Sequence, residues 1–119
     1  MIKGYLGNVC FNGELLKNHI IYTDSKKRIK KITPFCCESE GIILCDNILL
    51  IVKKEIEDKL QIKRLQEVYN NCDSYISFFK TEAYSKYGAT DINGATFIEL
   101  GDAKTIKKER DKALSSRLL

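Results

Sequence analysis

The pattern of hydrophobic and polar positions changes once along the chain, near Lys53. Before that point, apolar residues alternate with polar ones or gather in short runs bounded by turn-forming residues, which is typical of strands. After it, apolar residues recur every three or four positions, which is typical of helices. The pattern predicts one α+β domain spanning residues 1–119. A small antiparallel sheet over residues 4–53 would be followed by two or three helices, within a helical part 54–119, packed on one face of the sheet.

The first strand is predicted over residues 4–11, and its apolar odd positions share one face. These positions are Tyr5, Val9 and Phe11. Asn12-Gly13 then forms a strong hairpin turn, because both residues accept positive φ.

Residues 18–23 are predicted to form the second strand and residues 28–34 the third. The spacing of three between Ile29 and Ile32 breaks strict alternation and predicts a bulge or an irregular edge. Pro34 would end the ladder because it has no N–H to donate.

The most apolar stretch is Gly41 to Lys53, GIILCDNILLIVK. Asp46-Asn47 is a turn signal at its centre, so two buried strands are predicted to meet there. The unbroken apolar run Ile48 to Val52 implies cover on both faces of its strand. Leu49 and Ile51 would point into the core, and Leu50 and Val52 to the opposite side. Because two helices cover one face only, we expect the other face to be buried in a two-fold homodimer or against a protein partner.

A first helix is predicted over residues 54–72 and a second over residues 74–87, with Ser74 as N-cap and Gly88 as C′ residue. The apolar side of the first helix would carry Ile56, Leu60, Leu65, Val68, Tyr69 and Cys72. That of the second would carry Ile76, Phe79, Ala83 and Tyr87. Residues 91–100 fit either a strand or a helix. The charged tail 102–119 is predicted to be a frayed or partner-dependent helix.

Composition fits a soluble domain, with 44% hydrophobic and 30% charged residues in 119. The net charge of +4 is below that of a dedicated nucleic-acid binder. The N-terminus lacks the apolar region of a signal peptide, and no apolar run reaches the length of a membrane span. Five irregularly spaced cysteines indicate free thiols in a reducing compartment. We therefore expect a cytoplasmic protein that does not enter a membrane.

Candidate metal ligands are few. His19 is the only histidine, and the vicinal pair Cys36-Cys37 with Cys45 does not have the paired spacing of a zinc site. We expect no stoichiometric transition metal, and His19 is interpreted as a half-exposed strand residue.

The late carboxylates Asp91, Glu99 and Asp102 could form an acid–base pair, but solvated loop acids are commoner. Gly4, Gly7 and Gly13 form no phosphate-binding pattern. The basic runs at residues 26–28, 30–31 and 107–108 are interspersed with acids, which favours solvated faces over a nucleic-acid groove. No catalytic residue, metal ligand or cofactor is assigned.

One family resemblance stands beside this pattern. The run from Phe11 to Phe35, FNGELLKNHIIYTDSKKRIKKITPF, resembles the start of amidohydrolase-superfamily enzymes. Glu40 to Leu50 is similar to the apolar strand that leads into the family's barrel, and Asn93-Gly94-Ala95 is similar to a segment near the family's end.

The resemblance implies a small β module built from both ends of such a chain, which in the family flank a metal-binding (β/α)8 barrel. The family's His-x-His motif and later histidines are absent, and a barrel takes about 250 residues. No metal ligand or catalytic residue of the family is therefore carried over.

Three functions remain open at this point. The first is a non-catalytic module for protein interaction or assembly. The second is a subunit or remnant of a split amidohydrolase-like enzyme. The third is a weakly basic nucleic-acid-associated protein, which steep weakening of binding with salt would reveal.

Overall fold

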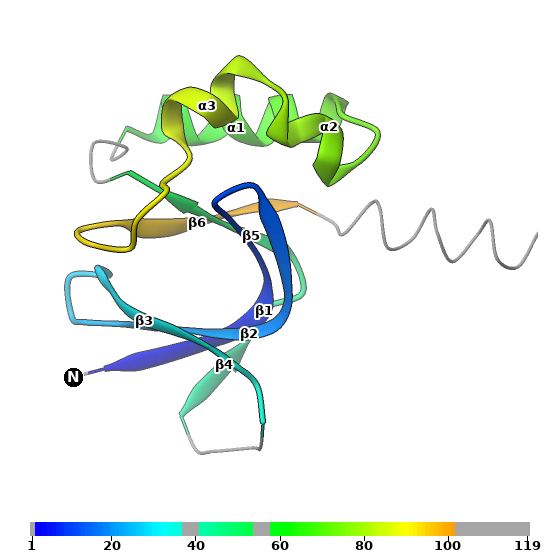
Figure 1. Cartoon of the computed structure of the whole chain (residues 1–119). Helices are drawn as coiled ribbons and strands as arrows, with labels where there is room; N and C mark the ends of the chain where they lie inside the picture. Colours follow the sequence, from blue (N-terminus) through cyan, green and yellow to red (C-terminus); the bar gives the residue numbers. More distant parts are fainter. Residues whose placement is uncertain (1, 37–40, 54–57, 102–119) are drawn as a thin grey trace, which may run out of the picture.

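The computed structural model describes residues 2–36, 41–53 and 58–101. These residues form β1 (Lys3–Phe11), β2 (Glu14–Thr23), β3 (Ile29–Pro34), β4 (Ile42–Leu44), β5 (Ile48–Val52), α1 (Lys59–Asn71), α2 (Tyr75–Phe79), α3 (Glu82–Tyr87) and β6 (Thr96–Gly101). The α+β class is confirmed (Figure 1). The sheet extends beyond residues 4–53, because β6 follows the helices and pairs with β5.

The sheet is mixed, and its strand order is β3-β2-β1-β5-β6. The remaining strand, β4, pairs with β1 next to β5. The pairs β1–β2 and β2–β3 are antiparallel, as predicted, and β6, which lies outside the predicted sheet, also pairs antiparallel with β5. However, β4 and β5 both run parallel to β1, so the prediction of a purely antiparallel sheet is wrong. The chain reaches this arrangement by crossing back after β3 and re-entering beside β1 in the same direction.

Asp46-Asn47 is not the corner that the sequence predicts. Leu44 pairs with Leu6 and Leu49 pairs with Val9, so β4 and β5 follow one another along the same side of β1. The chain advances five positions between Leu44 and Leu49 while β1 advances three. The polar dipeptide therefore absorbs a change of register. Asp and Asn interrupt an apolar run both where a chain reverses direction and where it only changes its register on a neighbouring strand. The sequence pattern therefore does not distinguish a turn from a register change.

The predicted hairpin between β1 and β2 is confirmed. Asn12 and Gly13 have φ angles of 51° and 77°, and Phe11 pairs with Glu14 across the turn. β2 therefore begins at Glu14, four residues before the predicted second strand. The predicted irregularity near Ile29 is also present, because the β2–β3 register shifts between Tyr22 and Thr23.

The sheet curls into a half-barrel, visible as the arc from β6 through β1 to β3 in Figure 1. One end is joined across the two outermost strands: the Ile29 N–H donates to the Ala95 carbonyl at 2.9 Å, and the Thr96 hydroxyl donates to the Lys27 carbonyl at 2.8 Å. The concave side encloses an inner core of Val9, Ile21, Ile29, Leu49, Ile51, Ala89, Ala95 and Phe97.

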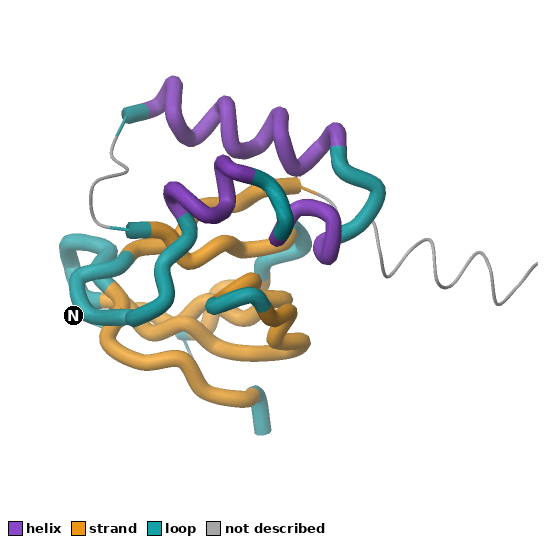
Figure 2. The backbone as a smooth tube through the Cα atoms, turned by 45° about the horizontal axis from the view of Figure 1, so that its top comes forward, coloured by secondary structure: helices purple, strands orange, loops and turns teal. Residues whose placement is uncertain are grey.

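The helices form a second layer over one face of β5 and β6, as Figures 1 and 2 show. A helix-facing core lies between them and consists of Cys10, Ile48, Leu50, Val52, Leu65, Tyr69, Phe78, Ile98 and Leu100. The sides predicted for Leu49 and Ile51, and for Leu50 and Val52, are confirmed. Both faces of β5 are covered within one chain, so its apolar run does not require a partner.

The first helix begins later than residue 54: Asp58 is the N-cap of α1, and its carboxylate accepts from the Leu60 N–H. Residues 54–57, including Ile56, lie outside the described residues. Leu65 and Tyr69 are buried as predicted, but Leu60 is 75% exposed, so its assignment to the apolar side is wrong. Leu60 lies in the first turn of α1.

The predicted second helix is two helices, α2 and α3. Ser74 and Thr81 each cap one of them, and the Thr81 hydroxyl also donates to the Phe78 carbonyl at 2.7 Å. This local bonding competes with a continuous helix. Within α2, Phe78 is buried and Ile76 is 53% exposed, so the prediction that Ile76 lies on the apolar side is wrong.

Residues 91–100 resolve into a loop followed by β6, which favours the strand interpretation. The tail 102–119 lies outside the described residues. None of the described helices is long and apolar enough to cross a membrane.

Candidate interaction surface

The candidate metal ligands are placed as follows. His19 is half-buried on β2, with its Nδ1 2.9 Å from the Lys17 carbonyl oxygen. Cys36 is exposed after β3, Cys45 is half-buried between β4 and β5, and Cys37 lies outside the described residues. Burial raises the pKa of the Cys45 thiol, and Glu99 and Asp46 raise it further. Over the described ranges, no three His, Cys, Asp or Glu side chains gather where they could hold a metal ion.

The carboxylates Asp91 and Glu99 each accept a hydrogen bond within the chain. Asp91 accepts from the Asn93 N–H at 3.0 Å in the loop before β6. Glu99 is exposed on β6 and accepts from the Asn47 amide at 3.4 Å. Asp102 lies outside the described residues. Asp91 therefore shapes a loop, and Glu99 lies beside the junction of β4 and β5.

The basic residues just before β3 and on it make contacts within the chain. The Lys27 ammonium lies 4.6 Å from the centre of the Phe97 ring, and the Lys31 ammonium lies 4.8 Å from that of Tyr22. Lys30 forms an ion pair with Asp24 at 3.7 Å. These cations stabilise the edge of the half-barrel. Lys107-Lys108 lies outside the described residues.

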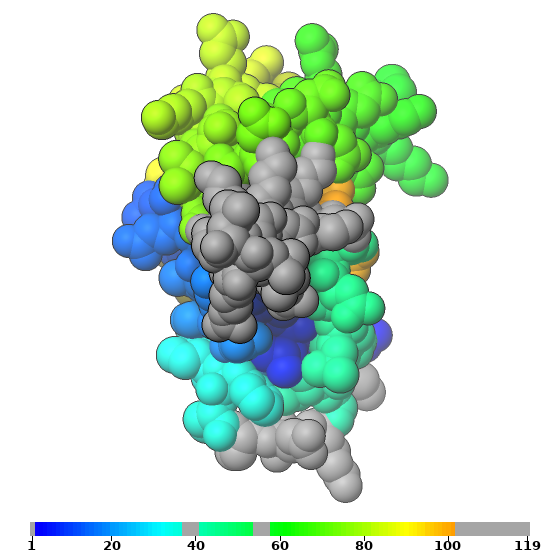
Figure 3. All heavy atoms as spheres, turned by 90° about the vertical axis from the view of Figure 1, so that its right-hand side faces the viewer, coloured from blue at the N-terminus to red at the C-terminus, as the bar shows by residue number. Residues whose placement is uncertain are grey.

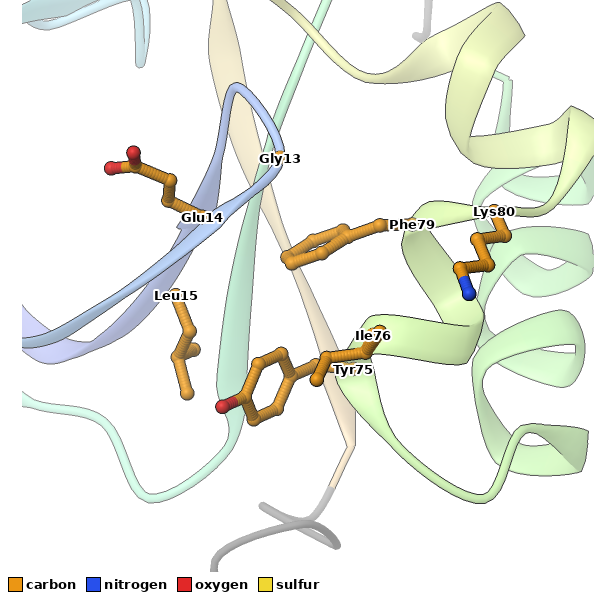
Figure 4. Close-up of a pocket in the computed structure, with 7 residues that line it drawn as sticks. All are labelled: Gly13, Glu14, Leu15, Tyr75, Ile76, Phe79 and Lys80. Atoms are coloured by element: carbon orange, nitrogen blue, oxygen red, sulfur yellow. The ribbon is translucent and has the colours of Figure 1, made fainter.

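A groove of about 470 Å³ separates the hairpin tip from α2 (Figure 4). It is lined by Gly13, Glu14, Leu15, Tyr75, Ile76, Phe79 and Lys80. The Gly13 N–H donates to the Tyr84 hydroxyl at 2.6 Å, which fixes the tip against α3. The groove can accept an apolar side chain. Sequence reasoning missed it because its two walls are about sixty residues apart in the chain.

A second apolar surface lies along β4. We call Ile2, Ile42, Ile43 and Leu44 the β4 edge surface. Ile2, Ile43 and Leu44 are 64%, 45% and 74% exposed. β4 pairs with β1 on one side, and no described strand pairs with its other side. In Figure 3 the chain around β4, coloured turquoise, is at the surface below the helical layer.

The edges of the sheet differ in their chemistry. β3, the strand at one end of the sheet order, carries Lys30, Lys31 and Pro34. Lysine and proline are residues with which proteins prevent an edge strand from pairing with another chain. β4 has the sequence Ile-Ile-Leu and carries neither charge nor proline. The apolar pattern could not reveal this edge, because Ile42–Leu44 and the fully buried Ile48–Val52 are equally hydrophobic.

Comparison of this chain with known protein families, with curated proteins and with solved structures found no match. The function is therefore inferred from the surfaces described above.

Proposed function

We propose that this chain is a small, non-catalytic cytoplasmic module for protein interaction or assembly, and that its contact surface is the β4 edge surface. The observation that carries the proposal is the exposure of Ile43 and Leu44 on a strand with an open edge. Exposed apolar side chains on an edge strand favour pairing with another chain, because the open edge adds a row of backbone donors and acceptors. An extended segment can dock there by joining the sheet.

Burial of these side chains would contribute to a weak, reversible contact. Full burial of a Leu or Ile side chain contributes roughly 1.5–3 kcal/mol. Leu44 is three-quarters exposed and Ile43 nearly half exposed. Most of the surface of Leu44 is therefore available to be buried against a partner. Backbone bonds along the edge supply direction and register in addition.

The test compares the wild-type chain with Leu44→Lys and with Ile76→Lys. Ile76 is the matched control, because it is also an exposed apolar residue but lies on α2. We expect sedimentation velocity, and titration with a purified partner captured on the immobilised chain, to show an association that Leu44→Lys abolishes and Ile76→Lys retains. Identical behaviour of all three proteins in both measurements would refute the proposal.

A second candidate is the β module of a split amidohydrolase-like enzyme. It is supported by the order of elements: a hairpin, a strand ending at Pro34, and then the apolar strands β4 and β5. It is also supported by β6, which follows Asn93-Gly94-Ala95 and joins the same sheet, because such a module is built from both ends of a chain. The partner would then be a barrel-forming chain.

This candidate predicts a neighbouring reading frame that encodes a barrel without its own β module. Co-expression of the two chains should give a complex of fixed stoichiometry that acquires metal-dependent hydrolase activity. Separate migration of the two co-expressed chains in gel filtration would argue against it.

A further inference from the structure

We propose that the partner at the β4 edge surface is a second copy of this chain, bound by antiparallel pairing of β4 with itself across a two-fold axis at Ile43. The proposal rests on the assembly function proposed above and specifies its partner and register.

The direction of the backbone groups determines the register. The Cys45 N–H donates to the Leu6 carbonyl at 2.8 Å, so Cys45 directs its polar groups toward β1. Alternate strand residues direct these groups to opposite sides, so Ile43 also faces β1, while Ile42 and Leu44 present their N–H and C=O groups to the open side. A two-fold axis at Ile43 places Ile42 of each copy opposite Leu44 of the other. Registers centred on Ile42 or Leu44 leave part of β4 unpaired.

The side chains are complementary in this register. Ile42 meets Leu44 of the other copy twice on one face of the joined sheet, and Ile43 meets its own equivalent on the other face. Apolar cross-strand pairs are favourable, whereas like charges directly opposite are destabilising. Self-pairing of β3 would bring Lys30 and Lys31 of two copies together, so the same geometry is unfavourable at that edge.

The size of the surface predicts a transient dimer. Stable interfaces bury about 1,200–2,000 Å² in total, and a three-residue strand with one flanking isoleucine provides less. We therefore expect dimers to form at high micromolar concentrations of this chain and to dissociate on dilution.

The experiment uses the full chain with Ile43→Cys or Leu44→Cys, in a background in which Cys36, Cys37, Cys45 and Cys72 are replaced by Ser. Residues opposite each other at a non-hydrogen-bonded position are about 4.5 Å apart between Cα atoms, which is within disulfide range. The two Leu44 positions are displaced along the strands to beyond the roughly 7 Å limit. We expect Ile43→Cys to form a disulfide-linked dimer at least about tenfold faster than Leu44→Cys.

Leu44→Cys is a stringent control, because Leu44 is more exposed than Ile43 and random collisions would favour it. Circular dichroism checks that each variant is folded. If the serine background is unfolded, the comparison is repeated with the native cysteines present, and mass spectrometry identifies the peptide that bears the introduced cysteine.

The outcomes separate this inference from the proposed function. Preferential cross-linking of Ile43→Cys, together with reversible association of the wild type, supports it. If Ile43→Cys cross-links no faster than Leu44→Cys, the proposed self-pairing is wrong. In that case the proposed interaction function is still supported if Leu44→Lys abolishes the association seen with the wild type. A wild-type chain that remains monomeric at about 1 mM also overturns it and points to another protein at the β4 edge surface.

Discussion

At the scale of single residues, the cysteines have different environments. Cys10 belongs to the helix-facing core, and burial raises the pKa of its thiol to about 12. Cys36 is exposed on the surface. Because the thiolate is the reactive form of cysteine, the two residues should differ sharply in their chemistry.

We predict that an aromatic disulfide reagent at pH 8 modifies Cys36 rapidly in the native protein and modifies Cys10 only after unfolding. The pKa of Cys10 in the folded protein lies above its ordinary value of 9.0. The contribution of the neutral thiol to the free energy of unfolding is therefore fully present below pH 9 and is lost as the pH rises toward about 12. Peptide mapping of the labelled protein checks the first statement, and urea unfolding at pH 8 and pH 10.5, with a Cys10→Ala variant as control, checks the second. Equal labelling rates for the two thiols in native conditions would contradict the packing of Cys10.

Asp24 organises the turn between β2 and β3. Its carboxylate accepts from the Lys26 and Arg28 N–H groups, each at 2.9 Å, and pairs with Lys30. The bond from the Arg28 backbone is the main reason that its pKa lies below the ordinary value. Because the pKa of Asp24 is lowered on folding, its ionised carboxylate stabilises the folded protein above pH 3.8, the ordinary pKa. This contribution is lost as the pH falls through the pKa that Asp24 has in the folded protein.

We therefore predict that Asp24→Ala lowers the melting temperature at pH 7 and that the difference from wild type shrinks below pH 3.8. The neighbouring exposed Ser25→Ala serves as the control and should behave as wild type throughout. Thermal unfolding measured between pH 2 and pH 7 gives both comparisons. The same difference in melting temperature at both extremes would show that the carboxylate charge does not stabilise the turn.

At the scale of secondary-structure elements, β5 connects the two cores. Leu49 and Leu50 are adjacent and fully buried, but one contributes to the inner core and the other to the helix-facing core. We predict that Leu49→Ala and Leu50→Ala each lower the free energy of unfolding by roughly 2–5 kcal/mol. Leu50→Lys should unfold the chain, because it places a charge in the helix-facing core.

Urea denaturation measures these changes, with Leu60→Ala as the control because that residue is largely exposed. Its effect should stay within about 0.5 kcal/mol. A small effect of Leu50→Ala, with a large effect of Leu49→Ala, would mean that the helical layer contributes little to stability.

A hydrogen bond from the Gly13 N–H to the Tyr84 hydroxyl joins the hairpin tip to α3. We predict that Tyr84→Phe lowers the free energy of unfolding by about 0.5–1.5 kcal/mol, which is the usual net contribution of such a bond. Tyr87→Phe on the same helix is the control. Faster hydrogen exchange of the Gly13 amide in Tyr84→Phe alone would confirm the bond, and unchanged exchange would contradict it.

Elements with a local signal could be predicted from the sequence. Asn12-Gly13 specifies its hairpin through backbone angles, and Ser74 specifies a helix start through its side chain. The parallel pairing of β1 with β4 and β5 depends on contacts about forty residues apart, for which no local residue type is diagnostic. The break at Thr81 was missed because its signal, a single capping hydroxyl, lies inside an otherwise continuous helical pattern.

At the scale of the whole molecule, the candidate surface could not be predicted, because it depends on which apolar segment lies at an edge. Leu44 and Leu50 belong to one apolar stretch, yet one is exposed and the other has no exposed surface. The difference arises because the helices cover Leu50 in the helix-facing core, whereas Leu44 lies on a strand whose open side pairs with no described strand and is 74% exposed. The sequence predicts a homodimer because one face of β5 would be uncovered, but both faces are covered within the chain. The homodimer is therefore now proposed at the open edge of β4.

The shared strand predicts that helices and sheet unfold together. Leu50 of β5 packs in the helix-facing core and Leu49 in the inner core, so loss of either layer uncovers one face of the same strand. We predict that urea transitions followed by helical circular dichroism and by the methyl resonance of Ile21 coincide. Transitions with separate midpoints would show that the helical layer is a distinct cooperative unit.

The late position of β6 in the chain has a consequence for synthesis on the ribosome. The hairpin of β1 and β2 can form early because its contacts are local. Its concave face, with Val9 and Ile21, stays uncovered until Phe97 has left the exit tunnel and paired with Ile51. Until β6 has emerged, the nascent chain therefore presents an apolar surface. In this interval the chain is most dependent on chaperones and most sensitive to proteases.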